Sequence, residues 1–178
     1  MRRRLGELPK VLAYSPSGGT PEYLAAIQGY YARLGIQLGP QQLLATTGGS
    51  EALLFSFMAC ADQGDEAIVV EPFYTNYSAF ARMAGVSLVP LTSKAEDGFH
   101  LPPREAWEKV LSDRTRMVIL CNPNNPTGSF IDAAWLQGFI ASVPPHVTVL
   151  LDEAYTEYLT PAQRYDSMAW VRAHPHRP

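Results

Sequence analysis

Apolar and polar positions follow two alternating periods along the chain. After Thr20-Pro21, apolar residues at helical spacing (Leu24, Ile27, Tyr31) predict a helix that ends at Gly35, with Thr20 as N-cap. Further along, short apolar runs predict strands at 43–47, 67–70, 87–91, 117–121 and 147–151, and helical patterns predict helices at 51–63, 74–83, 104–111 and 132–141. No element is predicted for 162–178. Strands and helices therefore alternate with short links.

This order of elements favours one fold class. Repeated βα units predict an α/β protein, a three-layer α/β/α arrangement around a mostly parallel sheet with right-handed crossovers. The continuous apolar character of 147–151 predicts a strand buried on both faces. We assign residues 1–178 to a single domain.

Composition and charge exclude several classes of protein. The 178 residues are 47% hydrophobic and 17% charged, as in a soluble globular domain. A net charge of −3 gives no field that would attract nucleic acid or an anionic membrane. We find no signal peptide, no apolar run of the ~18–20 residues that a membrane span needs, and no metal-ligand cluster. Cys60 and Cys121 lie in apolar runs, so we expect two buried, reduced thiols and a cytoplasmic protein.

The candidate functional residues are those that directly follow the strands, because ligands of parallel α/β sheets bind beyond the carboxyl ends of the strands. Gly48, Gly49 and Ser50 place backbone N–H groups and a hydroxyl where a helix begins, which suits a phosphate but also describes an ordinary tight turn. Tyr74 follows the second strand, where its ring could cover a flat ligand or simply pack.

Two further segments that directly follow apolar strands are rich in polar residues. Asn122–Gly128 contains two prolines and a Thr-Gly turn, a stiff backbone that suits the holding of Asn125 in place. Asp152 follows an apolar strand, so it either bears a desolvation cost, meets a cationic partner, or caps a helix.

Together these segments resemble the signature of the class I/II aminotransferases, the pyridoxal 5′-phosphate (PLP) enzymes of fold type I. The motif N-P-x-N-P-T-G occurs at 122–128 and D-x-A-Y at 152–155, with G-G-S-E-A-L upstream and P-x-Y-x-x-Y at 72–77. The resemblance extends from about Tyr14 to the tail. It implies the large domain of an enzyme that moves an amino group between an L-amino acid and a 2-oxo acid.

The resemblance also implies roles for the residues that match its motifs. Asp152 would pair with the ring nitrogen of PLP and keep it protonated. Asn125 and Tyr155 would hydrogen-bond the phenolic oxygen of the ring. Tyr74 would stack on the ring.

Two roles concern the phosphate of the cofactor. Gly49 and Ser50 would bind it, and Tyr14 resembles the family tyrosine that reaches the phosphate of the partner subunit, which implies a homodimer.

The family's Schiff-base lysine is missing from its expected place. It belongs to an S-x-x-K segment after D-x-A-Y, whereas Lys10, Lys94 and Lys109 all precede Asp152. The stretch 166–171 resembles the approach to that lysine. We therefore expect 1–178 to be a partial large domain without the lysine segment and small domain, inactive alone and poorly soluble.

The sequence also fits two other functions. Gly48–Ala52 is close to the nucleophile elbow G-x-S-x-G, and Asp152 and His174 follow in the order of a serine hydrolase that uses Ser50. Alternatively, the chain is a non-catalytic aminotransferase-like remnant or interaction module.

Overall fold

The computed structural model describes residues 13–173 and divides the chain into two compact units, Met1–Thr46 and Thr47–Pro178. In the first unit, helix α1 spans Pro21–Arg33, and the side chain of Thr20 accepts a hydrogen bond from the Tyr23 N–H (3.3 Å), as the predicted N-cap requires. A 3₁₀ turn, η2, follows at Pro40–Gln42.

The predicted strand at 43–47 is wrong. Residues 43–46 have no regular structure, and helix α2 already begins at Gly48. The Ala45 N–H bonds to the carbonyl of Gly18 (3.1 Å), which belongs to a turn and not to a strand. An apolar run becomes a strand only when a neighbouring strand takes up its backbone groups.

The second unit contains a four-stranded, all-parallel sheet in the order β2-β1-β3-β4. Its strands are β1 (Glu66–Glu71), β2 (Ser87–Thr92), β3 (Thr115–Cys121) and β4 (Thr148–Asp152). Its helices are α2 (Gly48–Cys60), α3 (Asn76–Ala84), α4 (Arg104–Val110), α5 (Ala133–Ser142) and α6 (Ser167–Ala173), with 3₁₀ turns η3 (Ala95–Asp97) and η4 (Thr156–Tyr158). The α/β class is thus confirmed.

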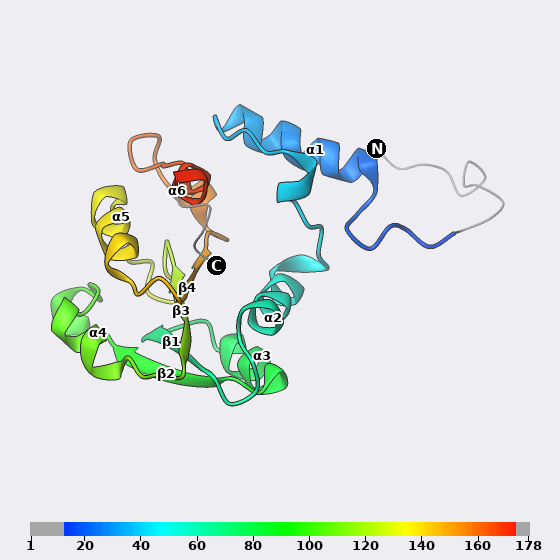
Figure 1. Cartoon of the computed structure of the whole chain (residues 1–178). Coiled ribbons are helices and arrows are strands. Elements are labelled where there is room, and N and C mark those ends of the chain that lie inside the picture. Colours follow the sequence, from blue (N-terminus) through cyan, green and yellow to red (C-terminus); the bar gives the residue numbers. More distant parts are fainter. Residues whose placement is uncertain (1–12, 174–178) are drawn as a thin grey trace. The chain divides into compact units, whose positions relative to one another are not determined.

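Helices cover both faces of this sheet because side chains alternate along its central strands. In β3, Met117 and Ile119 pack in a core cluster with residues of α2 and α3. Val118 and Leu120, pointing the other way, pack with residues of α4 and α5. Figure 1 shows α2 and α3 on one side of the strands and α4 and α5 on the other. The three predicted layers are present.

Three expectations about this unit need correction. Strand β4 is half-buried along its whole length, since it lies at the end of the strand order with a strand neighbour on one side only. Cys121 is a buried free thiol as expected, but Cys60, near the end of α2, is only half-buried. Helix α6 occupies part of the tail for which no element was predicted.

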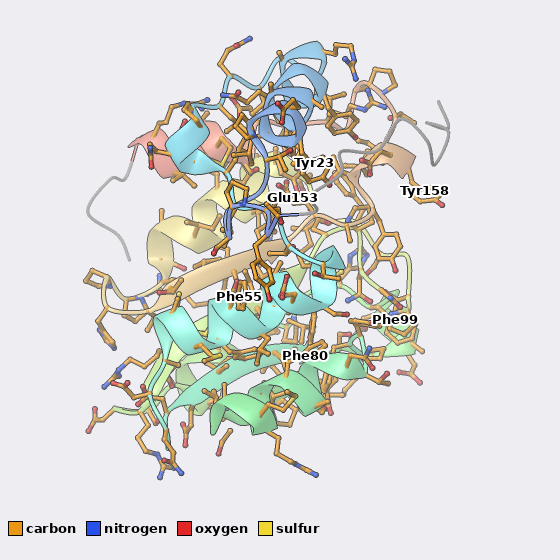
Figure 2. All side chains as sticks on the ribbon, turned by 90° about the vertical axis from the view of Figure 1, so that its right-hand side faces the viewer. Tyr23, Phe55, Phe80, Phe99, Glu153 and Tyr158 are labelled. Atoms are coloured by element: carbon orange, nitrogen blue, oxygen red, sulfur yellow. The ribbon has the colours of Figure 1, made fainter. Side chains whose placement is uncertain are left out.

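Two further observations concern the surface. Tyr158 is 84% exposed, and its side chain points away from the ribbon (Figure 2). Within residues 13–173, no helix combines the length and apolar character needed to cross a membrane.

Candidate functional site

A cavity of about 370 Å³ opens where the carboxyl ends of β3 and β4 meet the start of α2. It is lined by residues of these three elements and of the loops that follow β1, β3 and β4: Gly49, Ser50, Ala52, Leu53, Ser56, Tyr74, Cys121, Asn125, Leu150, Leu151, Asp152, Glu153, Ala154 and Tyr155. Six of the seven residues expected to bind the cofactor thus line one cavity. Residues from 49 to 155 come together because parallel strands bring their carboxyl ends to one edge of the sheet.

The first turn of α2 forms one wall. Gly48 opens the helix with a φ of +76°, a conformation that favours glycine, and Gly49 and Ser50 follow on the cavity side. Glu51 Oε2 accepts a hydrogen bond from the Thr47 N–H (2.6 Å), which orders the entry to the helix. The backbone N–H groups at a helix start favour an anion at this place.

The asparagine-proline segment is held by its own side chains. Asn122 is fully buried; its amide nitrogen donates to the Ile131 carbonyl and its amide oxygen accepts from the Ile131 N–H, both at 2.9 Å. Asn124 Oδ1 accepts hydrogen bonds from the N–H (3.1 Å) and the hydroxyl (2.8 Å) of Thr127. The loop is therefore preorganised, and Asn125 projects from it toward the cavity.

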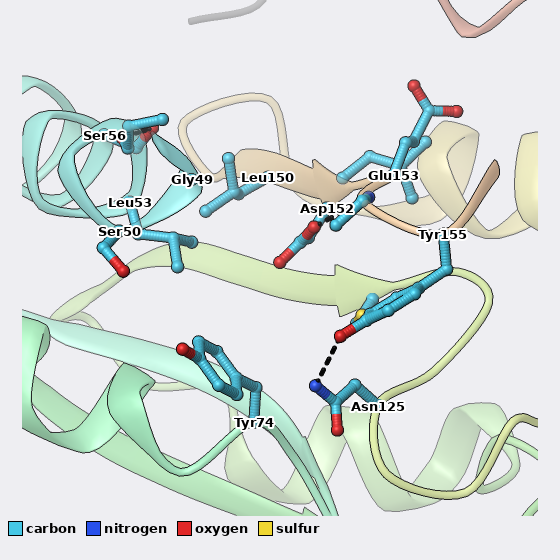
Figure 3. Close-up of a pocket in the computed structure, with 14 residues that line it drawn as sticks. Gly49, Ser50, Leu53, Ser56, Tyr74, Asn125, Leu150, Asp152, Glu153 and Tyr155 are labelled. Atoms are coloured by element: carbon cyan, nitrogen blue, oxygen red, sulfur yellow. Dashed lines mark hydrogen bonds between the residues drawn. The ribbon is translucent and has the colours of Figure 1, made fainter. Parts of the chain in front are cut away.

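Asn125 and Tyr155 meet on one side of the cavity (Figure 3). The Asn125 Nδ2 donates to the Tyr155 hydroxyl oxygen at 2.9 Å, although 30 residues separate them (Figure 3). The tyrosine hydroxyl keeps its own proton, and the amide a second N–H, so the pair can still donate to an oxygen atom of a ligand.

Asp152 is the last residue of β4, and Figure 3 shows its carboxylate pointing into the cavity. Its Oδ2 accepts a hydrogen bond from the Tyr77 hydroxyl (2.6 Å) and its Oδ1 from the Ala154 N–H (3.1 Å). Asp152 is not a helix N-cap, because the next turn of helix, η4, begins only at Thr156. The shortest side-chain hydrogen bond of its carboxylate comes from the neutral phenol of Tyr77 and not from a cation.

Tyr74 forms the wall opposite α2, with its ring facing the cavity (Figure 3). Its hydroxyl oxygen accepts a hydrogen bond from the Asn76 Nδ2 (2.7 Å), and its ring lies edge-on to that of Tyr77 at 5.7 Å. These contacts hold the plane of the ring, which a stacking role requires.

Burial perturbs two ionisable groups beside Asp152. It raises the pKa of the Cys121 thiol to about 11, and the Asp152 carboxylate raises it further, so this thiol stays protonated at neutral pH. Burial also raises the pKa of Glu153, while the hydrogen bond from the Ser167 hydroxyl (2.7 Å) acts in the opposite direction. Figure 3 shows the Glu153 side chain pointing away from Asp152. The two adjacent side chains therefore have different surroundings.

The remaining predicted residues lie elsewhere. Tyr14 belongs to the first unit, where its side chain is exposed. His174 and Lys10 fall outside the described residues, while Lys94 and Lys109 are absent from the lining of the cavity. Sequence reasoning missed Tyr77, whose position in the P-x-Y-x-x-Y motif was the available signal.

Comparison with known proteins adds independent findings. The family model "Aminotransferase class I and II" matches residues 2–177. A histidinol-phosphate aminotransferase of Cupriavidus pinatubonensis is 39% identical over 146 residues, which are 81% of this chain and 38% of that protein.

Solved structures agree with this match. The aspartate aminotransferase of Thermus thermophilus with maleate has a TM-score of 0.74 at 30% identity, over 85% of this chain and 41% of that one. The aromatic aminotransferase of Pyrococcus horikoshii has a TM-score of 0.78 at 28% identity, over 88% and 43%. The chain thus spans about two fifths of the length of these relatives.

Proposed function

Because the chain belongs to the aminotransferase class I and II family, whose members are PLP-dependent enzymes, we propose that its protein transfers an amino group between an L-amino acid and a 2-oxo acid. In this proposal, residues 1–178 are part of the large domain, and the Schiff-base lysine and small domain lie outside them. One observation supports it above all: the Asp152 carboxylate and the Asn125–Tyr155 pair face one cavity that begins at a helix N-terminus.

The donor set of this cavity fits PLP. A cavity of about 370 Å³ falls within the range of small-molecule sites. PLP presents a phosphate, a phenolic oxygen and a basic ring nitrogen, which respectively need N–H groups, neutral donors and an acid. Gly49 and Ser50 supply the first, Asn125 and Tyr155 the second, and Asp152 the third.

When bound, PLP supplies an electron-accepting ring that stabilises negative charge at the substrate's α carbon. The protein's residues control that ring. Asp152, held by two hydrogen bonds, would keep a proton on the ring nitrogen, and Asn125 and Tyr155 would donate to the phenolic oxygen. Tyr74 would cover a face of the ring, and the start of α2 would hold the phosphate.

The named relatives act on different amino acids, so the donor is proposed only as a class. We extend the proposal to a cytoplasmic homodimer in which Tyr14 reaches the phosphate of the partner subunit. Sedimentation of the protein with and without PLP tests the dimer. A monomer in both states, with PLP bound, contradicts it.

The serine hydrolase is the weaker alternative. Ser50 and Asp152 do line one cavity, but none of the described residues that line it is a histidine. A fluorophosphonate probe should leave Ser50 unlabelled.

PLP binding by the 178-residue chain is the direct test, measured by quenching of tryptophan fluorescence. Asp152→Asn removes the charge opposite the ring nitrogen and should weaken PLP binding at least about tenfold, the effect of one charged hydrogen bond. Asp113→Asn is the matched control, since this exposed acid is absent from the lining of the cavity and should leave the affinity unchanged. Absence of PLP binding by the wild-type chain, or equal effects of the two variants, contradicts the proposal.

A further inference from the structure

Tyr77 lies behind the wall of the cavity and outside its lining. It belongs to the first turn of α3, is 1% exposed, and reaches the end of β4, 75 residues further along the chain. There its hydroxyl donates to Asp152 Oδ2 at 2.6 Å. A buried phenol therefore donates a short hydrogen bond to the carboxylate that faces the cavity.

The carboxylate of Asp152 is fixed through both of its oxygens. The Ala154 N–H holds Oδ1 at 3.1 Å, within the same turn, and the Tyr77 hydroxyl holds Oδ2 from another layer of the fold. A carboxylate with one donor can rotate about its Cβ–Cγ bond, but two donors from different directions define its plane.

The same side chain supports a second wall of the cavity. Its ring meets the ring of Tyr74 edge-on, with centroids 5.7 Å apart and an interplanar angle of 87°. It also stacks on Phe73, with centroids 6.1 Å apart and an interplanar angle of 10°. Tyr77 thus links the ring-covering residue and the acid that faces the ring nitrogen.

The Tyr77 hydroxyl is a permanent donor. Burial, together with the nearby Cys121 and Asp152, raises its pKa far above the ordinary value for tyrosine, so it is protonated at neutral pH. Its proton is directed at Asp152 throughout.

From this geometry we propose that Tyr77 is a positioning residue that keeps the Asp152 carboxylate aimed at the ring nitrogen of the cofactor. The inference rests on the proposed PLP site and deepens it. Tyr77 touches neither cofactor nor substrate; it acts through Asp152. Its effect should therefore appear only with ligands that carry a nitrogen at that ring position.

The test compares two ligands on the 178-residue chain: PLP and its 1-deaza analogue, in which a C–H group replaces the ring nitrogen. Tyr77→Phe keeps the ring and its contacts with Phe73 and Tyr74 and removes one hydroxyl. It should weaken PLP binding about tenfold, the effect of one hydrogen bond to a charged group, and leave binding of the deaza analogue unchanged. Tyr158→Phe, which removes an exposed hydroxyl, should change neither affinity.

A second variant provides rescue. Tyr77→p-aminophenylalanine keeps the size of the ring and an N–H donor, so it should fold like the wild type and restore most of the preference for PLP. Loss of both ligands to the same extent in Tyr77→Phe, or failure of the amino variant to restore the preference, overturns the inference.

The two proposals can fail separately. If the wild-type chain binds PLP more tightly than the deaza analogue and Tyr77→Phe leaves that ratio unchanged, only the role of Tyr77 is refuted. If the wild type binds no PLP, the proposed function fails, and the role of Tyr77 fails with it.

Discussion

Phe57 and Phe55 in helix α2 allow a direct test of how the site is supported. Phe57 is fully buried against the sheet and α3, whereas Phe55, on a different face of the same helix, is 42% exposed. Phe57→Ala removes apolar surface and leaves a cavity, which costs about 3–5 kcal/mol of unfolding free energy. Phe55→Ala loses only the transfer energy of its covered part and leaves no closed cavity, about 1 kcal/mol.

Urea unfolding followed by far-ultraviolet circular dichroism measures both free energies. The two variants are matched in residue type, helix and size of the deletion, so helix propensity cancels in the comparison. We expect Phe57→Ala to be the less stable variant by at least about 2 kcal/mol. Equal destabilisation would show that α2 is not docked through Phe57, and the position of Gly49 and Ser50 at the cavity would then lose its support.

Three further predictions address other parts of the fold. Burial raises the pKa of Cys121 to about 11, so the folded state keeps the thiol proton at a higher pH than the unfolded state does. The contribution of this thiol to the free energy of unfolding should be fully present below about pH 9 and fall by up to about 1.4 kcal/mol per pH unit toward pH 11. Urea unfolding at a series of pH values should show a smaller fall over this range in Cys121→Ala and an unchanged one in Cys60→Ala. Gly85→Ala should destabilise by about 1–2 kcal/mol in thermal unfolding, because φ is +75° at this helix end, whereas Gly138→Ala, in α5 with open space around its Cβ, should stabilise by up to about 1 kcal/mol. Tyr165→Phe removes the oxygen that accepts a 2.9 Å hydrogen bond from Asn122, and we expect a loss of about 1 kcal/mol by urea unfolding; an unchanged midpoint would contradict it.

Elements with a full set of apolar neighbours were predictable from the sequence. Alternate residues of strand β3 pack against helices on opposite faces of the sheet, and the continuous apolar run in the sequence predicted this strand. Helix α5 begins after Asp132, whose side chain accepts the Trp135 N–H at 2.9 Å, a capping signal visible in the sequence. Local patterns sufficed where local and tertiary preferences agree.

The sequence predictions failed where contacts with residues distant in the sequence determine the local structure. Residues 43–47 have the composition of a strand, but a strand exists only with a neighbour. Helix α6 is short; its one clear signal is Asp166, whose carboxylate accepts the Ala169 N–H at 3.1 Å. The site motifs were recognisable, yet the bond between Tyr77 and Asp152 joins residues 75 apart and has no signature in either neighbourhood.

The distribution of the site over the chain also determines when it can form. Its pairs join residues 75 and 30 positions apart, and each depends on crossovers of a parallel sheet, so loop-closure entropy must be overcome before any of them exists. On a ribosome, the N-terminal strands and helices emerge well before Asp152 and Tyr155 do. A ligand that senses Asp152 and Tyr155 therefore binds only after β4 has joined β3.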